Sequence, residues 1–331
     1  MAVGLQEFYI SPEFVEQTDQ HLAQLKPYTD RSPANFSTDF LGVHTDVKFY
    51  EMLNPSMVEN ARAEQSMTDR RPPTVKNGEQ YFELGSLVAA INDCRGRFVM
   101  AELGGGWGAR VVSAHAMVQK IKPIDEFYIL VEAMGNHCEW IAEHMSRNSM
   151  NPKDHSIIHA AVWTDNSPKL FPVCTGVMGQ SLKTSVPQMV SDMSPVDAKV
   201  ALMNVIRTGS IGFEEDHKSR FAEFKRGWAF VSSVTMRDLF LPVDVVDYVD
   251  MDIQGAELEV ITHGMDILRQ KVRRMHIGTH GAEIHDNLLK QFRESNWDVV
   301  VHIPPAGQYQ CEWGSFSSFD GILSVVNKEL S

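Results

Sequence analysis

A glycine-rich stretch is the first place in this sequence where residue types and spacing could do chemistry. Four glycines fall among residues 104–108, directly after an apolar run over 98–103 that ends in Glu102 and Leu103. This pattern predicts a buried strand that turns sharply into a helix, where no side chain keeps a ligand away from the backbone. We therefore expect a cofactor at this turn. The residues expected to hold it are Glu102, Gly104, Gly105, Gly106, Trp107 and Gly108, together with Asp252 from a later run.

Acids and histidines after two later apolar runs form a second group. Asp250 and Asp252 end the run over 245–253, and Glu257 follows closely. His280, with Glu283 and His285, follows the run over 273–279. In an open α/β sheet the carboxyl ends of the strands face the ligand crevice, so these side chains are candidates for the reaction itself. Two acids on one side of a strand are costly unless they are solvated, paired or bound to a metal.

Glu132 closes the apolar run over 127–131, the next after the glycine turn. Nucleotide cofactors are often held by an acid placed roughly 20 residues beyond such a turn, because a carboxylate can accept from two vicinal ribose hydroxyls. We expect this role for Glu132, with Ala133 beside it; a solvated acid at a strand end is the alternative. Ala161 and Val162, at the end of a third run over 156–163, are expected near the adenine edge.

The elements that must position these residues alternate along the chain. Apolar runs over 98–103, 127–131, 156–163, 245–253 and 273–279 are separated by segments with helical periodicity, which predicts a parallel sheet with right-handed crossovers. Runs over 297–303 and 321–326 predict a closing hairpin that adds one antiparallel strand. Residues 1–80 are expected to be a helical and loop-rich extension, and 81–331 the main domain. The long connection over 175–230 is expected to be a lid or substrate-binding insertion.

Composition limits the partners. The chain has 331 residues, 43 acids against 30 Lys and Arg, and a net charge of -13, which argues against a nucleic-acid substrate. Four dispersed cysteines suggest neither disulfides nor a thiolate metal site, so a reducing cytoplasm fits best. We expect neither export nor membrane insertion, because there is no signal-like start and no apolar run of about 18 residues.

The glycine turn fits two cofactor classes. With Ala109 it matches the G-x-G-x-x-G/A fingerprint of dinucleotide binders, and it also resembles the first motif of class I S-adenosylmethionine (SAM) methyltransferases. The later motifs favour the second: residues 102–108, 252–257 and 276–280 together resemble the FkbM-type branch of class I SAM-dependent O-methyltransferases. The resemblance spans about 80–327. It implies a Rossmann-like methyltransferase sheet, mostly parallel and flanked by helices, with SAM as cofactor.

The resemblance implies methyl transfer to a hydroxyl of a small-molecule or sugar-like acceptor. Strands ending in Asp252 and His280 should be neighbours, so we expect His280 as general base, supported by Asp252, with Glu257 as a third catalytic residue. The family often has Lys where this chain has Asp250. A divalent metal on Asp252 and His280, with Asp250 and Glu283 as further ligands, ranks second. A catalytically silent SAM-binding or scaffold protein, or an NAD-dependent dehydrogenase, would also fit these motifs. The N-terminal extension is a candidate for homodimer contacts.

Overall fold

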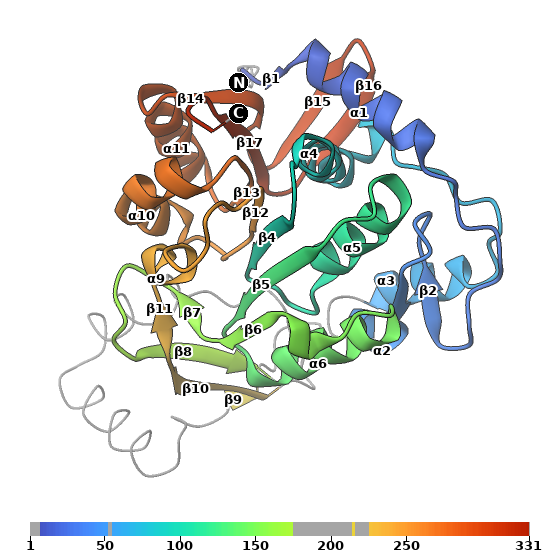
Figure 1. Cartoon of the computed structure of the whole chain (residues 1–331). Helices are drawn as coiled ribbons and strands as arrows, with labels where there is room; N and C mark the ends of the chain where they lie inside the picture. The colour runs from blue at the N-terminus through green and yellow to red at the C-terminus, as the bar shows by residue number, and fades with distance from the viewer. Residues whose placement is uncertain (1–6, 52–54, 175–213, 216–224, 331) are drawn as a thin grey trace.

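A central eight-stranded sheet organises the molecule (Figure 1). The computed structural model describes residues 7–51, 55–174, 214–215 and 225–330. In spatial order the strands are β1 (Tyr9–Ile10), β14 (Trp297–Ile303), β17 (Gly321–Asn327), β13 (Arg274–Thr279), β12 (Tyr248–Met251), β4 (Phe98–Leu103), β5 (Glu126–Glu132) and β6 (Ser156–His159).

Strand directions confirm the predicted fold class. The ladders from β13 through β12, β4 and β5 to β6 are parallel, and β17 runs antiparallel to both β13 and β14. This is the mostly parallel, Rossmann-like sheet that the sequence predicts, with the antiparallel strand supplied by the C-terminal segment. β1, which pairs antiparallel with β14, is a further edge strand that the sequence did not predict.

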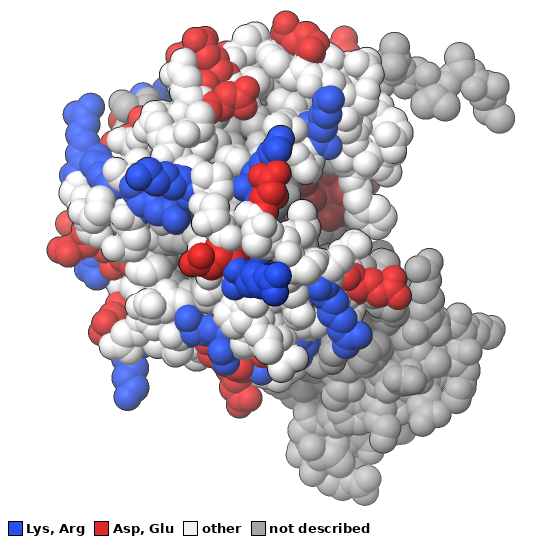
Figure 2. Space-filling view, turned by 90° about the vertical axis from the view of Figure 1, so that its right-hand side faces the viewer, with Lys and Arg blue, Asp and Glu red and all other residues white. Residues whose placement is uncertain are grey.

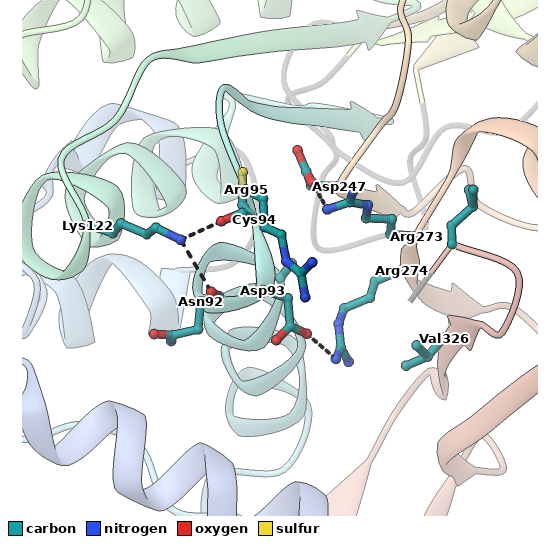
Figure 3. A pocket seen from close by; sticks show the side chains of 11 residues that line it. Asn92, Asp93, Cys94, Arg95, Lys122, Asp247, Arg273, Arg274 and Val326 are labelled. Carbon is teal, nitrogen blue, oxygen red and sulfur yellow. Dashed lines mark hydrogen bonds and ion pairs between the residues drawn. The ribbon is translucent and has the colours of Figure 1, made fainter.

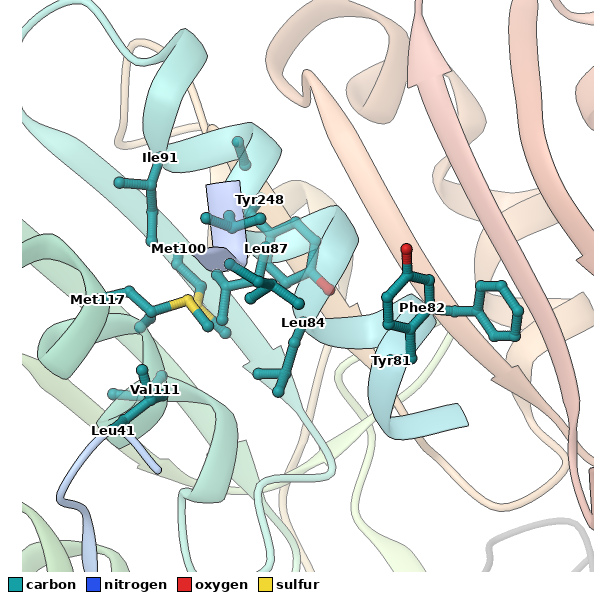
Figure 4. Close-up of a cluster of buried hydrophobic side chains, with 14 of the residues drawn as sticks. Leu41, Tyr81, Phe82, Leu84, Leu87, Ile91, Met100, Val111, Met117 and Tyr248 are labelled. Carbon is teal, nitrogen blue, oxygen red and sulfur yellow. The ribbon is translucent and has the colours of Figure 1, made fainter. Parts of the chain in front are cut away.

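Helices cover both faces of the sheet. α1 (Pro12–Gln24), α4 (Glu79–Asp93), α5 (Ala109–Ile121) and α6 (Gly135–Arg147) share one buried core with the sheet, while α9 (Met236–Phe240), α10 (Glu257–Lys271) and α11 (Ala282–Glu294) share another. Figure 4 shows the first core, where Leu87 and Ile91 of α4 lie near Met100 of β4. All three of these side chains are fully buried. Each Å² of apolar surface removed from water stabilises the fold by about 25 cal/mol. Burial of these side chains therefore holds α4 against the sheet.

The N-terminal segment packs on this framework. Ser11 caps α1 by accepting from the Phe14 backbone N–H, and the helix begins at Pro12. Phe14 and Leu22 of α1 belong to the same core as α4. The segment also contains β2 (Phe36–Thr38), β3 (His44–Asp46), α2 (Val47–Glu51), α3 (Pro55–Glu64) and the short 3-10 helix η1 (Val75–Asn77). The split of the chain at residue 80 stays a prediction.

The third predicted strand is interrupted. A single strand over 156–163 was expected, but β6 ends at His159 and the chain turns at Ala160 into β7 (Ala161–Val162), which pairs with β11 (Ser233–Val234) outside the main sheet. The 3-10 helix η2 (Pro152–Asp154) precedes β6. The prediction failed here because an apolar run does not reveal where a chain changes sheets.

Smaller sheets lie beyond the main one. β8 (Lys169–Cys174), β10 (Lys225–Val231) and β9 (Glu214–Glu215) form an antiparallel sheet next to β7 and β11. Most of the expected lid over 175–230 lies outside the described residues. β15 (Gly307–Cys311) and β16 (Gly314–Ser318) form a hairpin between β14 and β17. No helix in the described part of the chain is long and apolar enough to cross a bilayer.

Candidate functional site

The glycine turn lies at the carboxyl end of β4 and presses against the loop after β12. Gly104, Gly106 and Gly108 have φ angles of 88°, 53° and 73°, which favour glycine. A Cβ atom on Gly104 would lie 1.9 Å from the Asp252 carbonyl oxygen. Only glycine therefore allows β4 and β12 to approach so closely at the point where a ligand would bind.

Glu102 supports this turn from beneath. It is 4% exposed, and its carboxylate accepts hydrogen bonds from the backbone N–H groups of Arg110 (3.3 Å) and Val111 (2.9 Å), in the first turn of α5. Burial raises the pKa of Glu102 to about 7, although these two bonds oppose the shift. The carboxylate holds the helix in place, so a direct contact with a cofactor stays a prediction.

Trp107 forms a wall of the turn. Its ring stacks on Phe49 of α2 with centroids 5.8 Å apart, and it meets Tyr50 edge-on at 5.5 Å. The backbone oxygen of Trp107 lies 3.0 Å from Nδ1 of the buried His144. Two aromatic side chains of the N-terminal segment therefore pack against the glycine turn itself.

Glu132 points at the same turn. Its carboxylate accepts from the backbone N–H of Gly106 at 2.8 Å and of Met134 at 2.7 Å. A carboxylate has lone pairs beyond these two, and its contact with a ribose stays a prediction. Ala133, half-buried beside it, has its carbonyl 3.0 Å from His159 Nε2. Ala161 and Val162 are each 5% exposed in β7, and their role at an adenine edge also stays a prediction.

A cavity of about 160 Å³ opens in front of the turn. It lies between α4, the start of α5 and the carboxyl ends of β4, β12 and β13. The residues that line it are Glu79, Glu83, Glu102, Gly104, Gly105, Trp107, Ala109, Arg110, Asp250, Met251, Asp252, His276 and Gly278.

A larger cavity of about 500 Å³ lies at the opposite, amino edge of the sheet (Figure 3). Four of its charged side chains form two ion pairs: Asp93 with Arg274 at 2.6 Å, and Asp247 with Arg273 at 3.2 Å. Open α/β sheets bind ligands at the carboxyl edge. The smaller cavity at the glycine turn is therefore the candidate site in spite of its size.

His280 stands at the mouth of this site among three carboxylates. Its Nδ1 is 2.9 Å from Glu257 Oε1, and its Nε2 is 3.4 Å from Asp252 Oδ1 and 3.6 Å from Asp320 Oδ1. Glu257 is completely buried, whereas the Asp252 side chain is 51% exposed. The structure thus brings together the three predicted catalytic residues and adds Asp320, which the sequence analysis missed.

The loop after β12 explains this convergence. Gln254 and Gly255 adopt φ angles of 54° and 100°, which turn the chain so that Glu257 begins α10 facing back toward the strand. Glu257 Oε1 accepts the Gly255 backbone N–H at 2.9 Å, and Gln254 donates to Asp252 at 2.6 Å. β12 and β13 are parallel neighbours, as expected, so the loop lies next to His280.

The surroundings of His280 do not agree with a neutral general base. Burial lowers the pKa of His280, but the hydrogen bond and the charge of Glu257, with the charges of Asp252 and Asp320, outweigh burial and raise it to about 9. The imidazole is then protonated at neutral pH and cannot accept a proton. His280 can accept a proton only after its own imidazolium proton has left, and its role as general base stays a prediction.

The residues expected to complete a metal site do not gather around Asp252 and His280. Asp250 is 5% exposed and faces Tyr248 at 3.5 Å, while Glu283 is exposed on α11. His285 is buried with its Nδ1 2.9 Å from Thr279 Oγ1. Across the part of the chain that the structure describes, no group of three or more His, Cys, Asp or Glu side chains is arranged to hold a metal ion.

Several residues of the site were missed by the sequence analysis. They are Glu79, Glu83, Arg110, His276 and Asp320. Glu79 and Glu83 carried a signal, because two acids four residues apart share one face of a helix whose neighbours are apolar. Asp320 carried none, since only the path of the C-terminal hairpin brings it to His280.

Comparison with protein-family profiles and with curated protein sequences finds no match. Solved structures do match. The methyltransferase FkbM of Methylobacillus flagellatus has a TM-score of 0.37 and 11% identity over 82% of this chain, which spans 60% of that protein's length. The L11 methylase of Lactobacillus delbrueckii scores 0.34 at 9% identity, covering 80% of this chain and 88% of that one. TrmK of M. capricolum, bound to S-adenosyl-homocysteine, scores 0.32 at 9% identity, covering 73% and 67%.

Proposed function

We propose that this chain is a SAM-dependent methyltransferase of the FkbM type that methylates a hydroxyl of a small-molecule or sugar-like acceptor. One observation carries the proposal: the glycine turn, Glu132 and the His280 cluster meet at one carboxyl edge of a methyltransferase-type sheet. The turn and Glu132 would hold the nucleoside and methionine parts of the cofactor. SAM would supply an electrophilic methyl group, so the protein mainly aligns the acceptor and removes its proton.

Proton removal would fall to the His280 cluster. Glu257 holds the Nδ1 side of the ring, which leaves Nε2 facing Asp252 and Asp320. In the ionised cluster, an acceptor hydroxyl can pass its proton to a neighbouring aspartate. His280 takes it only once the imidazolium has lost its own proton. We therefore expect activity to rise with pH toward about 9 if His280 is the acceptor of the proton, and at lower pH if an aspartate is.

A small, non-polyanionic acceptor fits the charge of the site. Acids outnumber bases in the lining of the cavity. On the face shown in Figure 2, the described Lys and Arg side chains are scattered among acidic ones instead of forming one continuous stripe. A polyanionic acceptor would gain little electrostatic binding energy from such a surface.

Two measurements test the proposal: calorimetry with S-adenosylhomocysteine, and mass detection of methylated products after the protein is incubated with SAM and a panel of hydroxyl acceptors. We expect binding and transfer, with no response to reduced nicotinamide. Binding without transfer over the whole panel would favour a silent SAM-binding protein, and a melting shift with reduced nicotinamide alone would favour a dehydrogenase. Activity that EDTA abolishes and Mg²⁺ restores would support the alternative in which a divalent metal takes part in the reaction.

A further inference from the structure

A row of buried polar side chains crosses four neighbouring strands beneath the cavity. Glu102 of β4, Asp250 of β12, His276 of β13 and Ser324 of β17 are successive register partners. Partners in register place their side chains on the same face of a sheet. Each is at most 5% exposed. Such a row is costly inside a protein unless its polar atoms find partners.

Two polar atoms beside this cavity have no hydrogen-bond partner in the part of the chain that the structure describes. Glu83 of α4 is 5% exposed; its Oε1 pairs with Arg110 Nε, but its Oε2 has no hydrogen-bond partner in the described chain. His276 is 3% exposed, with Nδ1 2.9 Å from Ser324 Oγ, and its Nε2 likewise has no partner among the described residues. Both residues line the cavity. Buried polar atoms are nearly always satisfied, so these two indicate a ligand position.

The cavity is also short of positive charge. Five carboxylates line it, those of Glu79, Glu83, Glu102, Asp250 and Asp252, against the single guanidinium of Arg110 among the described lining residues. Burial, together with the neighbouring carboxylates, raises the pKa of Glu83 and of Asp250 well above the ordinary range, although Arg110 opposes both shifts. A ligand that brings a positive charge and hydrogen-bond donors would relieve both deficits.

We propose that this cavity is a subsite for a protonated primary amine, accepted by Glu83 Oε2, the Asp250 carboxylate and His276 Nε2. An ammonium group has three N–H donors and no acceptor, which matches three acceptor groups. It is also compact enough for a cavity of about 160 Å³. A carboxylate or phosphate would instead meet five acids. Burial, with a smaller effect from Arg110, lowers the pKa of His276 to about 3, so its ring is neutral and can accept.

Two molecules could supply this ammonium group. One is the cofactor, whose amino-acid end carries an α-ammonium; the other is an acceptor that bears an amine. The cofactor as source rests on the proposed function, whereas an amine-bearing acceptor does not. Two ligand pairs, one of nucleosides and one of sugars, in each of which only one member carries an ammonium group, separate the two sources.

The experiment compares wild type with Glu83→Gln, which keeps the shape and an oxygen for Arg110 but removes the charge. Glu294→Gln, an exposed Glu→Gln change on α11, is the matched control. Calorimetry gives the Kd of S-adenosylhomocysteine and of 5′-deoxy-5′-methylthioadenosine, which lacks the amino-acid end. Glucosamine and glucose are then compared in the presence of S-adenosylhomocysteine.

Wild type is expected to prefer the ammonium-bearing member of one pair by about 10-fold or more, as for a charge-assisted hydrogen bond. Glu83→Gln should reduce that preference to about twofold, while Glu294→Gln retains it. If Glu83→Gln loses the preference in the nucleoside pair, the ammonium belongs to the cofactor. If it loses the preference in the sugar pair, the ammonium belongs to the acceptor. An unchanged preference in Glu83→Gln overturns the subsite.

Two further outcomes distinguish failure of the amine subsite from misfolding of the variant and from failure of the proposed function. If Glu83→Gln does not fold, Asp250→Asn takes its place, and a wild type that shows no preference in either pair already refutes the subsite. A wild type that binds no S-adenosylhomocysteine refutes the proposed function and with it the cofactor as source. The sugar pair, measured alone, then decides whether the amine subsite exists.

Discussion

Replacing Glu257 by Gln should return His280 to a neutral histidine at physiological pH. The raised pKa, about 9 against an ordinary 6.5, corresponds to about 3 kcal/mol at 1.36 kcal/mol per pKa unit. Glu257 contributes most to the increase, through a 2.9 Å hydrogen bond and through its charge. An amide oxygen at the same place still accepts from Nδ1. We therefore expect the position of the ring to be kept and the pKa of His280 to fall by about 2 units.

NMR titration of imidazole-labelled protein measures this pKa directly. Asp252→Asn is the matched comparison, because Asp252 is 3.4 Å from Nε2 but half-exposed, so solvent screens its charge and the decrease should be smaller. A Glu257→Gln protein whose His280 titrates within half a unit of wild type would refute the assignment of the shift to this pair.

The same substitution should change how stability depends on pH. A histidine whose pKa is raised on folding stabilises the folded state fully below about pH 6.5, and this stabilisation is lost as pH rises toward 9. Urea unfolding at pH 6.5 and pH 9 should therefore show a smaller loss of stability for Glu257→Gln than for wild type. Equal losses in the two proteins would contradict the linkage.

Three other predictions concern the turn and the buried histidines. Glu132→Ala should weaken S-adenosylhomocysteine binding by about 1.5 to 3 kcal/mol in calorimetry; a change below twofold would remove Glu132 from the site. Burial lowers the pKa of His144 and of His285 to about 4. Lowering the pH from 7 to 5 should therefore reduce the free energy of unfolding by about 2 kcal/mol for each histidine. In urea titrations, His285→Phe should show a smaller loss of stability over this pH range than wild type. Gly104→Ala should melt far below Gly96→Ala, because both have positive φ but only Gly104 faces a backbone oxygen at 1.9 Å; equal melting temperatures would disprove the steric explanation.

Local patterns in the sequence were enough to predict most of the framework. α5 spans Ala109–Ile121, as its periodicity and the preceding glycines predict, and β4, β5, β12 and β13 lie where apolar runs predict them. The fold class followed from the alternation of these elements. Period and turn chemistry are properties of neighbouring residues, so no tertiary contact is needed to detect them. The break at Ala160 was missed because pairing with β11 depends on a partner more than 70 residues away.

The chemical state of the site was decided by the tertiary structure alone. The sequence indicated Asp252, Glu257 and His280 as a group, but a histidine pKa depends on every charge within a few ångströms. One of those charges, Asp320, arrives from the C-terminal hairpin. Likewise, Glu83 Oε2 and His276 Nε2 have no hydrogen-bond partner among the described residues. They are buried only because α4 packs over the sheet and excludes water. Burial and Coulomb energy depend on distances through space, and these become defined only when segments far apart in the chain pack together.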